Sequence, residues 1–173
     1  MNLDNLNIRN ATRADIDQIV SIKVYGWKSA YINIIDNKFL NDMSEDKERK
    51  AYTNKYSLDD VFVAETNDDI VGFCRIYDYK ESPYDDKEID CEIREIYVKP
   101  EMKRMGIGSK LFSYVLEYLK NKGKRKLYLG VFENNYKSRK FYEKMGGTPG
   151  KKGSLEIKDK EYPIVSYIYY LDK

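Results

Sequence analysis

The segment from Cys91 to Gly123 constrains the fold more than any other part of the chain. It reads CEIREIYVKPEMKRMGIGSKLFSYVLEYLKNKG: an apolar, β-rich run ending at Val98, a basic turn with two glycines, and an amphipathic stretch. Apolar residues of that stretch recur at the spacing of one helical face, namely Leu111, Phe112, Val115, Leu116 and Leu119. The segment therefore predicts a strand, a loop and a helix, in this order.

The turn between this strand and helix is suited to hold a phosphate group. Its letters are Lys103-Arg104-Met105-Gly106-Ile107-Gly108, followed by Ser109 and Lys110. The two glycines lack the side chains that would keep an anion off the backbone, so the amides that open the helix can point at phosphate oxygens. Lys103, Arg104 and Lys110 add positive charge beside the positive end of the helix dipole. We expect a phosphorylated ligand here.

Two common phosphate loops do not fit these letters. A dinucleotide fingerprint needs a third glycine where this chain has Leu111, and a P-loop needs four residues between its first glycine and Gly-Lys-Ser/Thr. The segment instead resembles the acyl-CoA loop of the GCN5-related N-acetyltransferase (GNAT) superfamily, Gln/Arg-x-x-Gly-x-Gly/Ala. Lys103 stands at the first position of that pattern. The departure is mild because lysine keeps a long donor side chain.

A second block downstream resembles another signature of the same superfamily. The run LYLGVF from Leu127 alternates as in a strand, and a helix is predicted to start near Asn135 and to stop at Gly146. The signature is Asn-x-x-Ala-x-x-Phe-Tyr-x-x-x-Gly, matched here by Asn135, Ser138, Phe141, Tyr142 and Gly146. Two blocks in the right order argue against chance agreement. The resemblance is close over both blocks and looser over the rest of the chain.

The resemblance implies an α/β fold around a mixed sheet, the GNAT acyl-CoA N-acyltransferase fold, with about seven strands and four helices. Residues 1–173 are expected to form a single domain. Other segments are predicted from their own patterns. They are an edge strand at Leu6–Arg9, a capping box at Thr12–Asp15 opening a helix, a helix from Ser44, a hairpin over 61–79 with its turn at 67–69, a polar loop at Lys80–Asp90, and terminal strands at Ser154–Ile157 and Ile164–Leu171.

Composition excludes several other classes. The chain is 42% hydrophobic and 35% charged, with a net charge of +2, so general attraction to nucleic acid or to an anionic membrane is not expected. The sequence has no apolar run of about 18 residues and its N-terminus is polar, so a cytoplasmic protein is expected. Without histidine, a Cys/His metal site and a Ser-His-Asp triad are excluded. Cys74 and Cys91 are expected to be reduced core thiols.

The resemblance implies acetyl-CoA as cofactor and transfer of its acetyl group to a primary amine by direct attack in a ternary complex. The ammonium form of an amine has a pKa of about 10.4, so a base near the amine is useful, although a water relay could substitute. Glu92 lies where members of the superfamily often carry a catalytic glutamate, and Glu95 is the reserve. A glutamate beside an arginine in a strand is also often only a cross-strand ion-pair partner. Strand alternation places Glu92 and Arg94 on one face and Glu95 on the other, unless a bulge intervenes.

Tyr142 is the expected acid, because a phenol with a pKa near 10 can protonate a departing thiolate. Asn135 is expected to bind the pantetheine arm, and the backbone of residues 96–98 to pair with its amides like an added strand. The predicted cofactor-binding residues are Ile96, Tyr97, Val98, Lys103, Arg104, Met105, Gly106, Ile107, Gly108, Ser109, Lys110, Asn135, Ser138 and Tyr142.

The acceptor is less well defined by the sequence. Trp27 and Tyr31 resemble a Trp-x-x-x-Tyr stretch that often forms one wall of the acceptor site, and with Glu92 they are the predicted substrate-binding residues; their spacing also fits a core stripe. The acidic residues of 84–90 favour a cationic small-molecule acceptor such as a polyamine, and solvated loop charges explain them equally well. Protein N-termini or lysines are alternative acceptors.

Two further classes of function stay open at this level. One is a non-catalytic acyl-CoA-binding regulator with the same fold, and the other is a nucleotide-binding α/β module unrelated to CoA. The tyrosines of the last strand, Tyr167, Tyr169 and Tyr170, would suit a homodimer formed at a sheet edge, although tyrosine on a half-buried strand is ordinary.

Overall fold

The structure is a computed structural model that describes residues 5–67 and 69–172. Its described strands form one mixed sheet in the order β1-β2-β3-β4-β5-β7-β6. The strands are β1 Asn7–Asn10, β2 Val61–Thr66, β3 Asp69–Asp78, β4 Cys91–Val98, β5 Lys126–Phe132, β6 Thr148–Ile157 and β7 Lys160–Tyr170. The helices are α1 Ile16–Ala30, α2 Asn37–Asp42, α3 Glu45–Asn54, α4 Ile107–Asn121 and α5 Tyr136–Lys144. Within the described part of the chain, no helix is long and apolar enough to cross a membrane.

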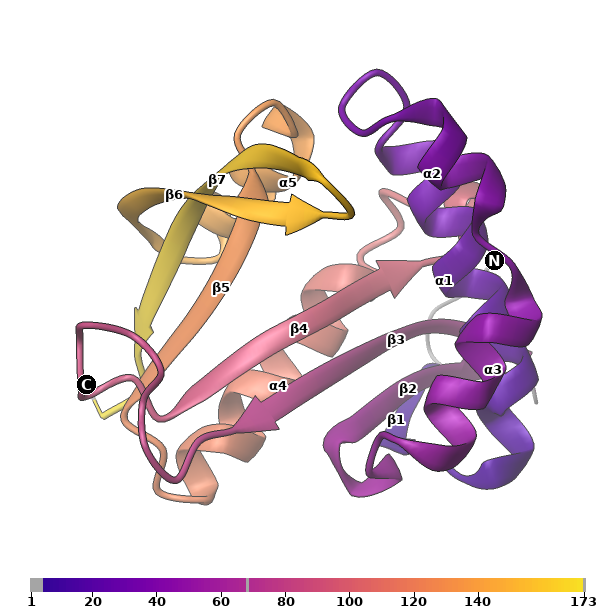
Figure 1. Ribbon diagram of the computed structural model, residues 1–173. Helices are drawn as coiled ribbons and strands as arrows, with labels where there is room; N and C mark the ends of the chain where they lie inside the picture. The colour runs from indigo at the N-terminus through magenta and orange to yellow at the C-terminus, as the bar shows by residue number, and fades with distance from the viewer. Residues whose placement is uncertain (1–4, 68, 173) are drawn as a thin grey trace.

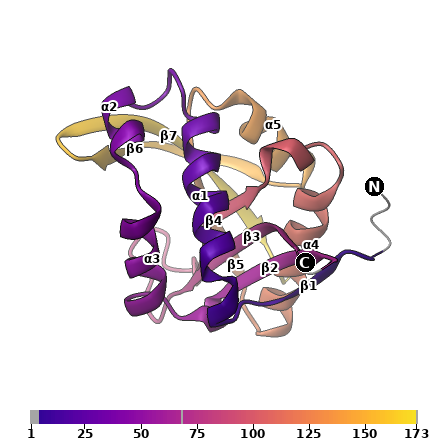
Figure 2. The same ribbon diagram turned by 90° about the vertical axis from the view of Figure 1, so that its right-hand side faces the viewer.

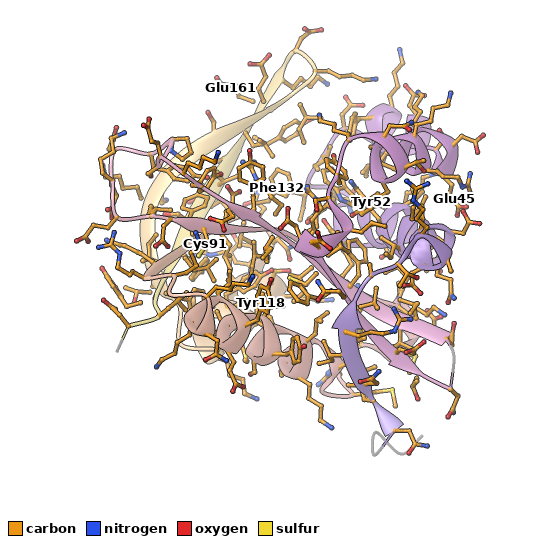
Figure 3. All side chains as sticks on the ribbon, turned by 90° about the horizontal axis from the view of Figure 1, so that it is seen from below. Glu45, Tyr52, Cys91, Tyr118, Phe132 and Glu161 are labelled. Atoms are coloured by element: carbon orange, nitrogen blue, oxygen red, sulfur yellow. The ribbon has the colours of Figure 1, made fainter. Side chains whose placement is uncertain are left out.

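Helices cover both faces of the sheet, with α1 and α3 on one side and α4 and α5 on the other (Figure 2). The two faces carry separate cores. Tyr52 of α3 packs on Phe73 on the first face, with a ring-centroid distance of 6.1 Å, and Tyr118 of α4 packs on Phe62 on the second at 4.7 Å (Figure 3). Cys74 and Cys91 are buried free thiols of the second core, as predicted.

The structure has one helix more than the sequence predicted. The additional helix is α2, which is short and is capped by Asp36, whose Oδ1 accepts a hydrogen bond from the Lys38 amide at 2.8 Å. Two turns of helix do not produce a visible apolar period, so only the capping residue signals it. The helix predicted from Ser44 is α3, and the Ser44 hydroxyl accepts from the Lys47 amide.

Other predicted boundaries shift slightly. The N-terminal strand runs one residue later than expected. The capping box at Thr12–Asp15 encloses a 3₁₀ turn, Arg13–Asp15, which leads directly into α1. The predicted hairpin of β2 and β3 is present, and β3 begins and ends one residue earlier than expected. The terminal strands are longer than the predicted ones. The first residues of β6 were missed because β6 is an edge strand that is exposed along nearly its whole length. An exposed edge strand lacks the apolar alternation from which strands are recognised.

The sheet opens between its two parallel strands. The ladder of β4 with β5 includes only the pairs Cys91–Leu127 and Glu92–Tyr128. Beyond these pairs the strands diverge, as Figure 1 shows, and β5 pairs with β7 along its full length instead. The divergence leaves a gap in the middle of the sheet, bordered by the second half of β4.

A β-bulge interrupts β4 at Arg94. Glu95 pairs with Arg75 of β3, and Ile93 pairs with the next residue, Ile76, so Arg94 has no partner of its own. Glu92 pairs with Tyr77, two residues from Arg75 on β3. Since alternate residues of a strand share a face, the bulge places Glu92 and Glu95 on the same face of the sheet. This face is the one covered by α1 and α3.

Candidate active site

The turn before α4 leaves its backbone amides uncovered. Gly106 is the N-cap residue, with φ of 88° and no side-chain cap. The first helical hydrogen bond runs from the Lys110 amide to the Gly106 carbonyl at 3.0 Å, so the amides of Ile107, Gly108 and Ser109 have no partner within the helix. Arg104, with φ of 68°, turns the chain just before this point. Free amides at the positive end of a long helix can hold an anion.

The side chains of the turn divide into two groups. Ile107 is buried and Met105 packs against the same core, so these two residues offer only their main chain to a ligand. Ser109 and Lys110 border a surface hollow of about 420 Å³ on the side of α4 next to Ile8 of β1. A second hollow, of about 480 Å³, lies between α1 and residues 99–101 and includes none of the predicted site residues.

Lys137 adds a cation that the sequence analysis missed. The pKa of Lys103 is lowered, first by burial and then by the positive charge of Lys137, so the two ammonium groups lie close enough to repel each other. Lys137 is in the first turn of α5, which contains no acidic residue. A lysine at the positive end of a helix is unfavourable unless an anion is near. That mismatch is the sequence signal by which Lys137 could have been found.

The end of β4 can accept an added strand. Ile96, Tyr97 and Val98 pair with β3 on one side, while the ladder to β5 has already ended at Glu92. The main-chain groups of these residues that face the gap are therefore not paired by the sheet. An extended chain with amides, such as a pantetheine arm, can pair with such an edge.

Tyr142 lies in α5 next to this gap. Its ring packs between Phe112 and Tyr167, at centroid distances of 5.8 and 5.9 Å, and its hydroxyl has no hydrogen-bond partner among the described residues. Burial raises the pKa of Tyr142 well above its ordinary value, and Tyr31 and Cys74 raise it further. Tyr31 follows the last residue of α1, on the opposite face of the sheet.

The predicted acceptor wall is present at the end of α1. Trp27 packs edge-on against Tyr31 at 4.9 Å, and Tyr31 packs in the same way on Phe132 of β5. The Tyr31 hydroxyl is 3.1 Å from the hydroxyl of Tyr97, which links this wall to β4. The indole Nε1 of Trp27 is buried without a hydrogen-bond partner in the described part of the chain. These contacts fit both interpretations of Trp27 and Tyr31, as one wall of an acceptor site and as part of the core.

Glu92 is buried on the same face, near the closed end of the gap. Its Oε2 accepts hydrogen bonds from the hydroxyl of Tyr84 at 2.9 Å and from that of Tyr79, and it lies 3.1 Å from Nε of Arg94. The pKa of Tyr79 rises to about 12, because of burial and then of the hydrogen bond to Glu92. Ile96 is four positions after Glu92, which is about 13 Å along a strand.

Glu95 is held in a buried ionic network. Its carboxylate lies 2.6 Å from Nζ of Lys23 on α1 and 3.1 Å from Nε of Arg75, and it accepts a hydrogen bond from Tyr52 on α3. Burial acts to raise the pKa of Glu95, but the charges of Lys23 and Arg75 outweigh it and the pKa is lowered. A carboxylate with a lowered pKa and this many donors is a poor proton acceptor.

Asn135 also caps a helix, a role that the signature motif does not indicate. It is the N-cap residue of α5, and its Oδ1 accepts a hydrogen bond from the Ser138 amide at 3.2 Å. Only the amide NH₂ of Asn135 is then left to donate to a ligand. Ser138 itself is partly buried at the start of the helix.

The comparisons with known proteins agree with this geometry. The sequence model of the acetyltransferase (GNAT) family matches residues 30–147, which is more than half of the chain. The chain belongs to this family. An uncharacterized N-acetyltransferase of Archaeoglobus fulgidus is 32% identical over 143 residues, which cover 79% of this chain and 89% of that protein. N-acetyltransferase is therefore its enzyme class.

Solved structures share the fold at lower identity. An N-acetyltransferase from Staphylococcus aureus Mu50 superposes with a TM-score of 0.72 at 24% identity, covering 98% of this chain and 100% of that one. The PaiA N-acetyltransferase of Thermoplasma acidophilum, solved in complex with coenzyme A, gives a TM-score of 0.66 at 19% identity, covering 95% and 99%. At these identities the likeness concerns the fold alone.

Proposed function

We propose that this chain binds acetyl-CoA and transfers its acetyl group to the primary amine of a small molecule, by direct attack in a ternary complex. The observation that carries the proposal is the gap between β4 and β5, which has the uncovered amides of the Gly106 turn on one side and the phenol of Tyr142 beside it. When bound, the coenzyme supplies an acetyl group already activated as a thioester.

In this proposal the chain binds and orients the coenzyme through three features. The amides after Gly106 bind the diphosphate, with Lys103 and Lys137 adding charge. The unpaired edge of residues 96–98 orients the pantetheine arm, and the NH₂ of Asn135 donates to it. Tyr142 then gives its hydroxyl proton to the departing sulfur. Burial raises the pKa of Tyr142, so the phenol is protonated at neutral pH but is a weaker acid than a free phenol. Its hydroxyl therefore donates a hydrogen bond to the sulfur, and the proton moves only as negative charge develops there.

We assign the base to Glu92. Glu95, the reserve, is the weaker candidate because Lys23 and Arg75 neutralise it. Glu92 is too far along β4 for direct contact with an amine at Ile96, so the proton must travel through intermediate groups. The hydroxyls of Tyr79 and Tyr84, which already donate to Glu92, or a water relay, can form that path.

The loop charges give less support to a polyamine acceptor than the sequence suggested. Asp85 pairs with Lys151, Asp86 and Glu88 both pair with Lys126, and Asp90 accepts from backbone amides at 125 and 126. A cationic acceptor would meet acids that are already neutralised. The proposal therefore specifies a primary amine, and a polyamine is one arm of its test.

The test is release of free CoA thiol from acetyl-CoA in the presence of amines, amino acids, polyamines and peptides. The proposal predicts release that depends on a small acceptor, and a fall in kcat of about 10²–10⁴-fold in Glu92→Gln. Retained kcat in that variant would reject Glu92 as the base. Coenzyme binding without turnover on any acceptor would favour a regulator, and tighter binding of ATP or NAD than of CoA would favour a nucleotide-binding module.

A further inference from the structure

The bulge of β4 places an arginine at the point where the sheet opens. Arg94 is the unpaired residue of the bulge, and its Nε lies 3.1 Å from Oε2 of Glu92. Glu92 is in turn paired with Tyr128, the last pair before β4 and β5 diverge. The guanidinium of Arg94 therefore lies on the face covered by α1 and α3, next to the closed end of the gap.

Three groups hold this guanidinium from one side. Besides the contact with Glu92, one Nη2 hydrogen is donated to the Tyr79 hydroxyl at 2.7 Å. The guanidinium carbon also lies 5.5 Å from the centre of the Tyr77 ring. Glu92 is itself fixed by the Tyr84 hydroxyl, so the support of Arg94 is a connected network.

The opposite edge of the guanidinium is free to bind a ligand. An arginine has five N–H donors, and the contacts of Arg94 use Nε–H and one Nη2–H. The two Nη1 hydrogens and the second Nη2 hydrogen have no partner among the described residues. They form the end-on fork that binds a carboxylate with two parallel hydrogen bonds. The Arg94 side chain is 43% exposed, so this fork is accessible.

On the strand across the gap, the residue two positions after Tyr128 is a glycine. Gly130 of β5 is exposed, and a Cβ there would lie only 3.3 Å from both the Tyr128 hydroxyl and Cδ1 of Ile164. A side chain at this position would crowd the face of the sheet between Tyr128 and Ile164.

We propose that Arg94 binds a carboxylate of the acceptor, and that the acceptor is therefore a small molecule of the amino-acid class, with a primary amine and a carboxylate. This inference rests on the proposed N-acetyltransferase function and names the substrate class for it. In this arrangement Arg94 is a specificity-determining residue: it fixes one end of the acceptor and leaves the amine to reach the thioester.

The experiment compares acceptors that differ only in the carboxylate. Ornithine and lysine are paired with putrescine and cadaverine, their decarboxylated forms, and with their carboxamides, which imitate a peptide N-terminus. Wild-type enzyme is expected to have a kcat/KM about 10- to 100-fold higher for the amino acids, the effect of one charge-assisted bidentate contact. Arg94→Gln should remove this preference, because kcat/KM falls more for the amino acids than for the diamines, and the Kd for CoA should be unchanged. Arg94 also contacts Glu92 and Tyr79, so the ratio of kcat/KM within each pair is the quantity to compare. Arg94→Lys, which keeps the charge without the fork, should restore part of it.

The control is Arg49→Gln, which removes an ion-paired guanidinium of similar exposure, 38%, from α3. It should leave the preference intact. The inference is overturned if wild-type enzyme prefers the diamines or carboxamides, or if Arg94→Gln lowers activity on both members of a pair equally. If no acceptor is acetylated, the proposed function fails. Calorimetric binding of ornithine to the CoA complex, lost in Arg94→Gln, would then still support the carboxylate site, and its absence would reject it.

Discussion

At the scale of single residues, the ionic network around Glu95 places charged groups in the interior, where each of them depends on its partners. Lys23 and Glu95 are both buried, and they join α1 to the bulge of β4. Burial of two charges is costly in itself, so removing one partner leaves the other uncompensated. The network also ties the bulge to two helices, and the bulge is what turns Glu95 away from the alternation expected of a regular strand.

We predict that Lys23→Met lowers the free energy of unfolding by about 3–5 kcal/mol, because Glu95 and Glu48 lose their shared ammonium. Arg49→Met, which breaks an exposed ion pair with Asp17, should cost less than about 1 kcal/mol. Urea unfolding measures both values. A loss in Lys23→Met no larger than in the control would show that the network does not stabilise the fold.

The same carboxyl group gives stability a pH dependence. Because the pKa of Glu95 is lowered in the folded protein, its contribution is fully present above the unfolded carboxyl pKa of about 4.3. It is lost as the pH falls through the lower, folded value. The wild-type protein should therefore lose more stability than Lys23→Met over this acidic range, when both are followed by urea unfolding.

At the scale of elements, the two glycines of the turn before α4 differ in whether the backbone requires a glycine. Gly106 has φ of 88°, where a side chain is strained, whereas a Cβ at Gly108 would make ordinary contacts, at 3.6 Å from Val98 and 3.9 Å from Phe141. The family pattern has the same asymmetry, because it admits alanine only at the second glycine.

We predict that Gly106→Ala destabilises the fold by about 1–2 kcal/mol and weakens CoA binding, because the strain moves the amides that open α4. Gly108→Ala should be close to wild type in both respects. Thermal unfolding and calorimetric titration with CoA test the pair of variants. Equal affinity for CoA in Gly106→Ala and wild type would remove the turn from the proposed binding site.

The elements that carry the site were the ones best predicted from the sequence. The unit of β4, its turn and α4, and the unit of β5 and α5, have strong local patterns, so their order and bounds are close to the prediction. The sequence analysis named a bulge in β4 only as an exception to strand alternation, because no residue type reliably marks a bulge. The structure places this bulge at Arg94. Lys137, and the pairing of the loop acids with Lys126 and Lys151, could not be predicted, since they depend on which distant segments meet.

At the scale of the whole molecule, the sheet brings two half-sites together. The elements α4 and α5 carry the proposed coenzyme-binding groups on one face, and the end of α1 carries the proposed acceptor wall on the other (Figure 1). The pairing of β4 with β5 ends after two residue pairs, and the elements that carry Tyr142 and Tyr31 lie on the two sides of the opening that follows. A reaction between a coenzyme on one face and an acceptor on the other has to take place in this gap.

The most direct test of the account is the turnover of Tyr142→Phe at saturating acetyl-CoA and acceptor, measured by thiol release. The account predicts a fall in kcat of about 10²–10⁴-fold with an unchanged Kd for acetyl-CoA, because the variant loses only the proton donor. The aromatic packing against Phe112 and Tyr167 is kept, so the fold should remain intact. A kcat within about twofold of wild type would contradict the assignment of Tyr142 as the acid.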